Sequence, residues 1–237
     1  MGRYGGGTWP TRAVLRPHKI CIAQHPCYTR IVHAPTEHET IRRSASSAHL
    51  LTAETLGVHP SAMARLTQEG TLERVAPGVY VGTAHSLHPL IEVAGWTLRH
   101  PQVVASLLTA AVFHDLTDAF ARGTWLFIPF GNSPPRSRVM TVHTVQVVPR
   151  LVVRENDAEN GIETIMVHGT EVRITGRDRT TLDLWHYPNH ISREYALDAL
   201  RRRLREPGFQ MPGFARLARR LGVWDRVEPV VQGMMLR

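Results

Sequence analysis

Lysine is almost absent from this chain of 237 residues, since Lys19 is the only lysine among 28 basic side chains. An enzyme that holds the phosphates of ATP with a lysine is therefore nearly excluded. Cysteine is almost as rare: Cys21 and Cys27 are the only two, and both lie close to the N-terminus. Disulfide bonds are therefore not expected to hold the fold together.

Long apolar runs are also missing. No stretch approaches the ~18 apolar residues of a membrane-spanning helix, and the first 36 residues contain no apolar segment typical of a secretory signal. No stretch matches a phosphate-binding loop, a nucleophile elbow or a zinc-protease signature. We therefore expect a cytoplasmic protein that has no catalytic residues and needs no cofactor.

Two groups of metal-ligating side chains occur, and neither has convincing spacing. The segment CIAQHPC, residues 21–27, lacks the paired ligand spacing of zinc sites. Asp183, His186 and His190 are close in sequence, but Pro188 should end the helix between the two histidines, which then need not share a face. We therefore predict no metal site.

The formal net charge of +8 is concentrated at the two ends of the chain. Residues 1–43 hold seven basic and two acidic side chains, and residues 161–237 hold thirteen and nine. Arginine forms bidentate contacts with phosphate and with guanine, so this excess favours a polyanionic partner. Codon usage in a GC-rich genome would also produce it.

The chain divides into three parts by its patterns. Residues 1–35 combine glycines, scattered prolines and no acidic residue, which predicts a disordered basic extension. Thr36 and Glu39 have the spacing of a capping box, which indicates that a helix starts there. We predict one domain over residues 36–84 and a second over residues 85–237, each able to fold alone.

Residues 52–70 have the spacing of a helix-turn-helix. Thr52 is expected to cap a short helix over residues 53–56, which Gly57 ends in a left-handed conformation. Pro60 suits the first turn of a second helix. The close crossing of the two helices would also require a small residue at position 53 and no side chain at position 57.

A two-stranded wing is predicted directly after this second helix, because residues 71–81 alternate apolar and polar side chains around a Pro77-Gly78 turn. With Met63 and Leu66 on the buried side, Ser61, Arg65 and Gln68 should face solvent. A winged helix that binds DNA is favoured over a purely structural helical hairpin. The net charge of −1 over residues 44–84 opposes DNA binding, but Arg42 and Arg43 could supply phosphate contacts, and so could the basic extension.

The remaining residues predict a mixed α/β domain, so that the whole chain is of the α+β class. Strands are expected at 103–106, 124–129 and 145–148, and a hairpin around residues 168–170. Helices are expected at 87–98, 109–116, 180–185, 192–204, 213–221 and 225–235.

The order of these features resembles the AbiEi family of type IV antitoxins of abortive-infection systems. The segments on which the resemblance rests are, in order, the winged helix with its Gly-Val-Tyr wing, SLLTAAVFHDL, the hairpin VHGTEVRIT and the run RDRTTLDLW. The resemblance covers residues 48–235 and does not include the N-terminal extension. It implies a repressor of its own operon that counteracts a nucleotidyltransferase-like toxin, without necessarily forming a stable complex with it.

The resemblance also implies functional roles for individual residues. It places DNA contacts at Ser61, Arg65 and Gln68, with Arg74 at the wing. In the C-terminal domain, Arg179, Thr180 and Asp183 match the antitoxin run. A structural role competes there, because Arg179 and Asp183 form an (i, i+4) pair that stabilises an exposed helix by only ~0.2–0.5 kcal/mol.

Arg201, Arg202 and Arg203 lie on an amphipathic helix and are either a docking patch for the toxin or a solvated face. Two other functions remain open for the chain as a whole. One is a plain winged-helix transcriptional regulator whose second domain senses a ligand or dimerises. The other is an enzyme that modifies the toxin or nucleic acid, for which the sequence offers no residues.

Overall fold

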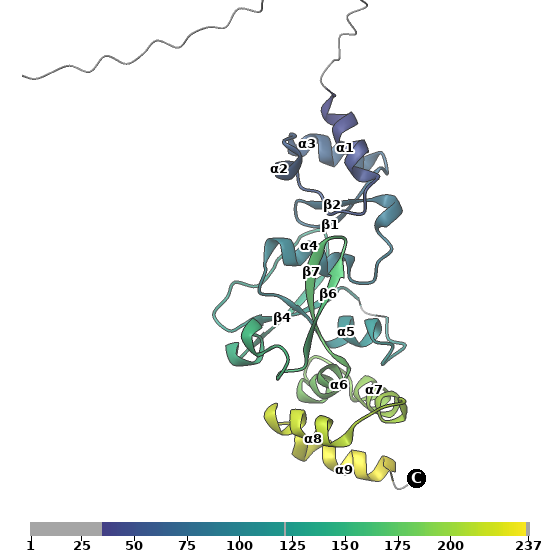
Figure 1. Cartoon of the computed structure of the whole chain (residues 1–237), viewed down its shortest axis with the longest axis vertical. Coiled ribbons are helices and arrows are strands. Elements are labelled where there is room, and N and C mark those ends of the chain that lie inside the picture. Colours follow the sequence, from purple (N-terminus) through teal and green to yellow (C-terminus); the bar gives the residue numbers. More distant parts are fainter. Residues whose placement is uncertain (1–34, 121, 236–237) are drawn as a thin grey trace, which may run out of the picture. The chain divides into compact units, whose positions relative to one another are not determined.

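The computed structural model describes residues 35–120 and 122–235, and residues from Pro35 onward form one compact unit. The expected disordered extension, with Cys21 and Cys27, lies outside the described residues apart from Pro35. The helices of the described part are α1 (Glu37–Ala45), α2 (Ala53–Leu56), α3 (Pro60–Gln68), α4 (Ile91–Arg99), α5 (Leu107–Phe113), α6 (Arg177–His186), α7 (Arg193–Arg205), α8 (Met211–Arg220) and α9 (Trp224–Met235) (Figure 1). The strands are β1 (Leu72–Ala76), β2 (Val79–Gly82), β3 (Val104–Ala105), β4 (Thr124–Pro129), β5 (Val142–Val147), β6 (Ile162–Val167) and β7 (Thr170–Thr175).

The N-terminal helices and hairpin form a winged helix-turn-helix-like fold. β1 and β2 pair antiparallel, and Leu51, between α1 and α2, adds a bridge to Tyr80 with backbone hydrogen bonds of 2.7 and 2.9 Å. Residues from all of these elements bury their apolar side chains together. This small core contains Ile41, Ala45, Leu51, Ala62, Met63, Leu66, Leu72 and Tyr80.

The local signals of this region act as the sequence predicted. Thr36 and Glu39 form the capping box of α1, and Thr52 accepts a hydrogen bond from the backbone of Thr55 to cap α2. Gly57 ends α2 with a φ of 63°. One reason given for Gly57 is wrong: a Cβ at this position would meet no atom within 4 Å, so the left-handed backbone, and not close helix packing, requires glycine.

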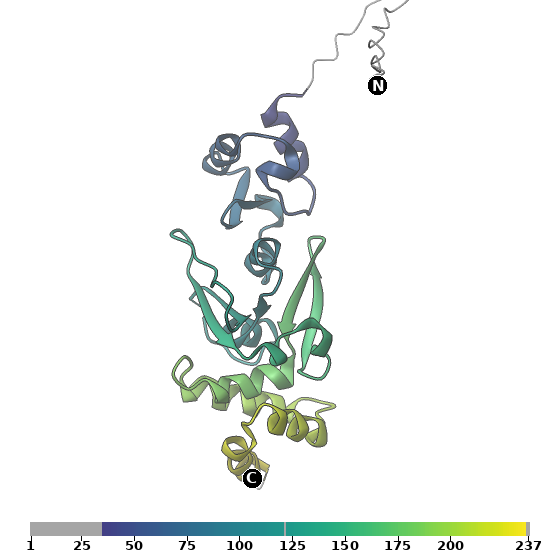
Figure 2. The ribbon, with the colours of Figure 1, turned by 90° about the vertical axis from the view of Figure 1, so that its left-hand side faces the viewer.

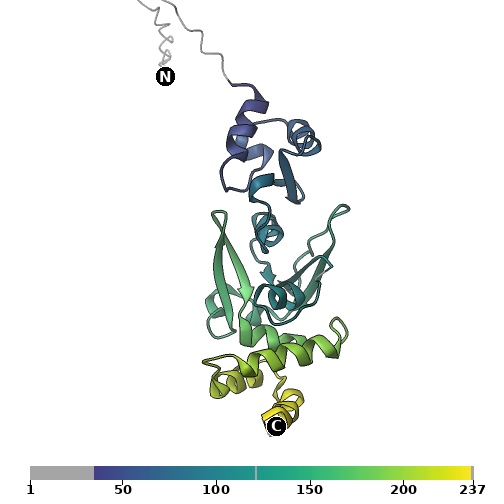
Figure 3. The ribbon, with the colours of Figure 1, turned by 90° about the vertical axis from the view of Figure 1, so that its right-hand side faces the viewer.

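A mixed five-stranded sheet follows, in the order β5-β4-β3-β7-β6. β3 runs antiparallel to β4 and parallel to β7, while β4 pairs parallel with β5 and β6 pairs antiparallel with β7. Figures 2 and 3 show α4 lying between the outer strand pairs β4–β5 and β6–β7, with α6 and α7 crossing on the opposite side.

Alternation along the strands divides the apolar side chains between two cores. Leu126 and Ile128 of β4 and Ile174 of β7 point to the side of α4, whereas Phe127 points to the side of α6–α9. This division follows from the two-residue period of a strand. The sheet is thus covered by helices on both faces, an arrangement that the sequence did not predict.

Several predicted elements start or end at different residues. The helix predicted over 87–98 begins only at Ile91, because Pro89 disfavours helical backbone at the residue before it. α5 covers residues 107–113 and not 109–116, since Asp115 has a φ of 56°. β5 starts at Val142, three residues before the predicted strand. The hairpin at 168–170 is confirmed.

The wing and the large sheet share a core. Val75, Ala76, Val79 and Val81 cluster with apolar residues of α4, β4 and β7. Gly95 in α4 allows the closest approach, because a Cβ there would lie 3.0 Å from the Val75 and Ala76 side chains. Packing therefore continues across the predicted domain boundary at residues 84 and 85.

Candidate nucleic-acid interface

One face of α3 is buried and the opposite face is exposed. Met63 and Leu66 have no exposed surface, whereas Ser61, Arg65 and Gln68 are exposed. The structure therefore brings these three predicted contact residues together on one side of one helix. Hydroxyl, guanidinium and amide groups at this spacing can reach hydrogen-bonding edges of bases in a major groove.

The start of α3 is fixed by a residue that the sequence analysis did not identify. The His59 Nδ1 atom accepts a hydrogen bond from the backbone N–H of Ser61 at 3.3 Å, and the Ser61 hydroxyl lies 2.7 Å from the same nitrogen. The His59 backbone N–H donates to the Glu37 carboxylate at 3.0 Å. This last contact fixes the first turn of α3 to α1. The residues that usually cap the N-terminus of a helix are serine, threonine, asparagine and aspartate, so the sequence pattern does not indicate a histidine in this role.

The two basic residues of α1 differ in their surroundings. The Arg42 guanidinium forms an ion pair of 3.1 Å with Glu69, the residue that caps the C-terminus of α3. Both side chains are largely exposed, so the pair contributes only ~0–1 kcal/mol. Arg43 is exposed and forms no ion pair with any residue of the described part. Both arginines can therefore turn toward a phosphate at small cost.

Arg74 does not share this exposure. Its guanidinium packs over the Tyr80 ring at 5.3 Å and donates a 3.1 Å hydrogen bond to the Tyr80 hydroxyl. A different arginine, Arg99, lies at the tip of the wing. A Cβ on Gly78 would be 3.3 Å from the Nη2 atom of Arg99, and Arg99 is exposed. Arg99 is distant in sequence from the wing, so no local pattern could have identified it.

Residues 40–81 match the family model described as "Transcriptional regulator, AbiEi antitoxin". These residues are thus similar to an AbiEi-type regulator domain. This finding confirms the resemblance inferred from the sequence over the winged helix. No helix of the described residues is long and apolar enough to cross a membrane.

Comparison with proteins of curated function gave no match. Among solved structures, the chain is similar to "Crystal structure of RV2827C protein from Mycobacterium tuberculosis". The two share 14% sequence identity, with 81% of this chain and 78% of that chain covered and a TM-score of 0.47. The AbiEi-type match itself includes all six predicted DNA contacts, namely Arg42, Arg43, Ser61, Arg65, Gln68 and Arg74.

The antitoxin run lies on α6, inside the protein. Arg179 and Asp183 are 1% and 2% exposed, and the Arg179 Nε donates to both Asp183 carboxylate oxygens at 2.9 and 2.8 Å. Thr180 is fully buried, and its hydroxyl donates to the carbonyl oxygen of Thr175 at 2.8 Å. These residues contact other parts of the fold and not solvent.

Burial changes the energetics of this pair. Desolvation raises the pKa of Asp183 to about 6, although Arg179 opposes that rise through its charge and hydrogen bonds. The ~0.2–0.5 kcal/mol of an exposed (i, i+4) pair therefore does not apply. The relevant quantity is the ~3–5 kcal/mol lost when one partner of a buried pair is removed.

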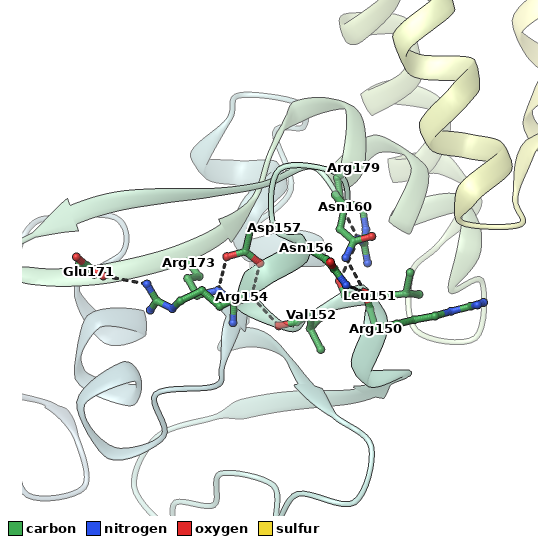
Figure 4. Close-up of polar contacts among 10 residues, drawn as sticks. All are labelled: Arg150, Leu151, Val152, Arg154, Asn156, Asp157, Asn160, Glu171, Arg173 and Arg179. Atoms are coloured by element: carbon green, nitrogen blue, oxygen red, sulfur yellow. Dashed lines mark hydrogen bonds and ion pairs between the residues drawn. The ribbon is translucent and has the colours of Figure 1, made fainter.

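Two buried arginines also hold the segment 149–160 against the sheet (Figure 4). Arg179 donates from Nη1 to the carbonyl oxygen of Asn160 at 2.9 Å. Arg173, on β7, pairs with Asp157 and donates to the carbonyl oxygen of Val152 at 2.6 Å. Guanidinium groups thus satisfy backbone carbonyls that a buried loop would otherwise leave without donors.

The predicted docking patch on α7 is not uniform. Arg203 is only 13% exposed and pairs with Asp178 at 2.6 Å and Glu206 at 2.8 Å. Arg202 pairs with Asp118 and Asp198. Arg201 is exposed and, within the described residues, forms no ion pair. Of the two roles left open for these residues, a solvated face without partners does not describe Arg202 or Arg203.

A cavity of about 670 Å³ lies between β6, α6, α7 and α8. Its lining is rich in arginine, but most of these charges have acidic neighbours. The ion pairs are Arg177–Glu206, Arg203–Asp178 and Arg220–Glu159. Five arginines and three acidic residues line the cavity, and among the described residues Arg216 is the only one of these arginines without an ion pair.

Proposed function

We propose that this protein is a DNA-binding antitoxin that represses its own toxin–antitoxin operon and counteracts a nucleotidyltransferase-like toxin. The observation that carries the proposal is the exposed polar face of α3, beside a wing, within the residues that match an AbiEi antitoxin regulator. The buried face of the same helix fixes its orientation, because Met63 and Leu66 are fully enclosed.

In this proposal α3 enters the major groove. Arg65 reads a guanine edge, Gln68 an adenine edge, and Ser61 contacts a base or phosphate near the start of the helix. Arg42 and Arg43 bind phosphates and set the register of the helix on the duplex. We transfer the wing contact from Arg74 to Arg99, because Arg74 is held by Tyr80 while Arg99 lies exposed at the wing turn.

A mobility-shift titration on the protein's own promoter tests this arrangement. We expect Arg65→Ala to weaken binding by ~1–3 kcal/mol and to relax the preference at one base pair. Arg43→Ala should weaken binding to all sequences and reduce the salt slope by about 1. Arg216→Ala, an exposed arginine on α8, is the control and should leave affinity unchanged. Unchanged affinity of Arg65→Ala would refute the placement of α3.

The antitoxin function requires a separate measurement. Cells that express the toxin of the same operon should be rescued by the full chain. The variant Arg65→Ala should also rescue them, because α3 serves the promoter and not the toxin in this proposal. Full rescue without repression would separate the two functions in one molecule.

The runner-up is a plain winged-helix regulator whose C-terminal part binds a ligand or dimerises. One observation favours it: the family match ends at residue 81 and includes none of the large sheet. Repression by the full chain without any rescue, from a toxin shown to be toxic, would establish this alternative.

A further inference from the structure

Histidines from separate segments meet where the winged helix contacts the β6–β7 turn. His85 and His88 follow β2, and His168 begins the turn after β6. The ring of His168 lies edge-on to both, with centroid separations of 6.1 Å to His85 and 5.9 Å to His88. The turn between β6 and β7 is directed toward the segment after β2 (Figure 1).

His168 occupies an unusual backbone position. Its φ is 47°, a left-handed conformation that a residue with a side chain rarely adopts. Its Nε2 atom is buried and has no hydrogen-bond partner within the described part of the chain. The next residue, Gly169, packs against a fourth imidazole, since a Cβ there would be 3.1 Å from the His49 Nδ1 atom. A two-residue hairpin loop accounts for the positive φ of both His168 and Gly169, whereas the unsatisfied nitrogen of His168 has no such explanation.

The contacts of the neighbouring rings require neutral imidazole at one position. The His88 Nδ1 atom accepts a 3.1 Å hydrogen bond from the backbone N–H of Leu90, so this nitrogen carries no proton. The His85 Nε2 atom lies 3.3 Å from the carbonyl oxygen of Ser46, to which it can donate. Protonation of His88 at Nδ1 would therefore remove the acceptor for Leu90.

No histidine of this contact forms an ion pair with a described residue, although Glu73, Arg74 and Glu92 line the same pocket as His88. Of the ion pairs formed by described residues, none includes a histidine, and the nearby Glu171 on β7 pairs with Arg154 at 3.0 Å. Burial lowers the pKa of His88, and the charge of His168 lowers it further. The imidazole rings next to His168 are His85, His88 and, across Gly169, His49, and the charged groups beside His88 are Glu73, Arg74 and Glu92.

We propose that these four imidazoles, His49, His85, His88 and His168, form an acid-labile clasp between the winged helix and the β6–β7 turn. In the folded chain His85 and His88 pack edge-on to His168, and His49 lies beside Gly169. Acidification places like charges on adjoining rings, and the turn separates from the segment after β2. The proposal concerns this contact in the chain itself and holds whether or not the chain is an antitoxin.

The sign of the effect follows from linkage. Because the folded state lowers the pKa of His88, the unfolded state binds more protons near pH 6. The neutral His88 ring therefore contributes its stability fully above the ordinary histidine pKa of ~6.5, and that contribution is lost as the pH falls. A charge change in this range makes the contact responsive to mild acidification.

The test compares thermal unfolding of the full chain at pH 7.5 and pH 5.5, in EDTA so that no bound metal contributes. His168→Asn keeps a side chain that tolerates a positive φ but cannot become charged. We expect the melting temperature of the unaltered chain to fall by roughly 2–4 °C more on acidification than that of the variant. His190→Asn, an exposed histidine outside the clasp, is the control and should retain the full pH effect.

Hydrogen exchange gives a local readout at the same two pH values. Amides of residues 165–170 and 83–90 should exchange faster at pH 5.5, after correction for intrinsic rates, while those of α3 should not. If His168→Asn is too unstable at pH 7.5, His88→Asn serves instead, because its amide oxygen can still accept from Leu90. Equal pH dependence in the unaltered chain and in the variant used would overturn the proposal, and so would unchanged local exchange.

Discussion

Asparagine in place of Asp183 tests whether the buried pair on α6 holds the C-terminal part of the fold together. The substitution keeps the shape of the side chain and leaves the Arg179 guanidinium buried without a counter-charge. Removal of one partner of such a pair costs ~3–5 kcal/mol. At roughly 2–4 °C per kcal/mol for a domain of this size, the melting temperature should fall by ~6–20 °C.

A double substitution distinguishes the cost of an unpaired buried charge from the cost of changing side chains at these two positions. Arg179→Met with Asp183→Leu removes both charges together and retains apolar volume. Because replacing a buried pair with apolar residues is often neutral, the double variant should be more stable than Asp183→Asn alone. The loss of the donor to Asn160 will offset part of this gain.

The pH dependence supplies a second signature. Burial raises the pKa of Asp183 to about 6, so the folded state takes up a proton before the unfolded state does as the pH falls. The contribution of Asp183 to the free energy of unfolding therefore increases as the pH falls, and it is lost as the pH rises through 6. Between pH 7.5 and pH 5, the difference in unfolding free energy between the unaltered chain and Asp183→Asn should widen by roughly 1 kcal/mol.

Arg154→Ala is the matched control for these measurements. It removes one partner of an ion pair of 3.0 Å with Glu171, whose side chains are 54% and 57% exposed. Such pairs contribute ~0–1 kcal/mol, so the melting temperature should change little. Chemical denaturation followed by circular dichroism provides the free energies. If Asp183→Asn costs no more than Arg154→Ala, the reasoning from burial is refuted.

Two further predictions concern the exposed arginines. Glu69→Ala should slightly raise affinity for the promoter in a mobility-shift assay, because it frees Arg42 for phosphate. Arg42→Ala should lower affinity and reduce the salt slope by about 1. Equal effects of the two substitutions would contradict this prediction. Arg203→Ala should destabilise the fold by ~1–3 kcal/mol, because it leaves Asp178 without its partner, while Arg201→Ala should stay within ~0.5 kcal/mol in the same melting assay. Loss of rescue by Arg201→Ala without loss of stability would support toxin docking at that residue.

Local signals made the winged helix predictable from sequence. The Thr36–Glu39 capping box, the left-handed Gly57 and the Pro77-Gly78 turn each depend on a few neighbouring residues. The same holds for the hairpin at residues 168–170, whose alternation and turn chemistry lie within one short segment. The exposed face of α3 followed from helical spacing alone.

Contacts between distant segments were not predictable in this way. β3 has only two residues and still lies at the centre of the sheet, where parallel and antiparallel neighbours meet. A strand was predicted over residues 103–106, but so short a segment shows no alternation from which its neighbours in the sheet could be predicted. Arg99 reaches the wing turn, and Arg202 reaches Asp118, only because the fold brings separated segments together. The burial of Arg179 likewise depends on β4 and on segment 149–160.

The predicted boundary between residues 84 and 85 can be tested by fragments, and the shared core sets the expected result. A fragment over residues 86–237 lacks Val75 and Ala76, which pack directly on Gly95 of α4. It would uncover apolar side chains of α4, including Ile91 and Ala94, and full exposure of a large one costs ~1.5–3 kcal/mol. We expect this fragment to be folded but to unfold at lower denaturant than a fragment over residues 35–237. In the shorter fragment, Ile91→Gln should increase solubility but should not raise the free energy of unfolding. In the longer fragment, the same substitution should lower the free energy of unfolding. Equal midpoints for the two fragments would show that the wing contributes nothing to the larger core and that the boundary divides independent domains.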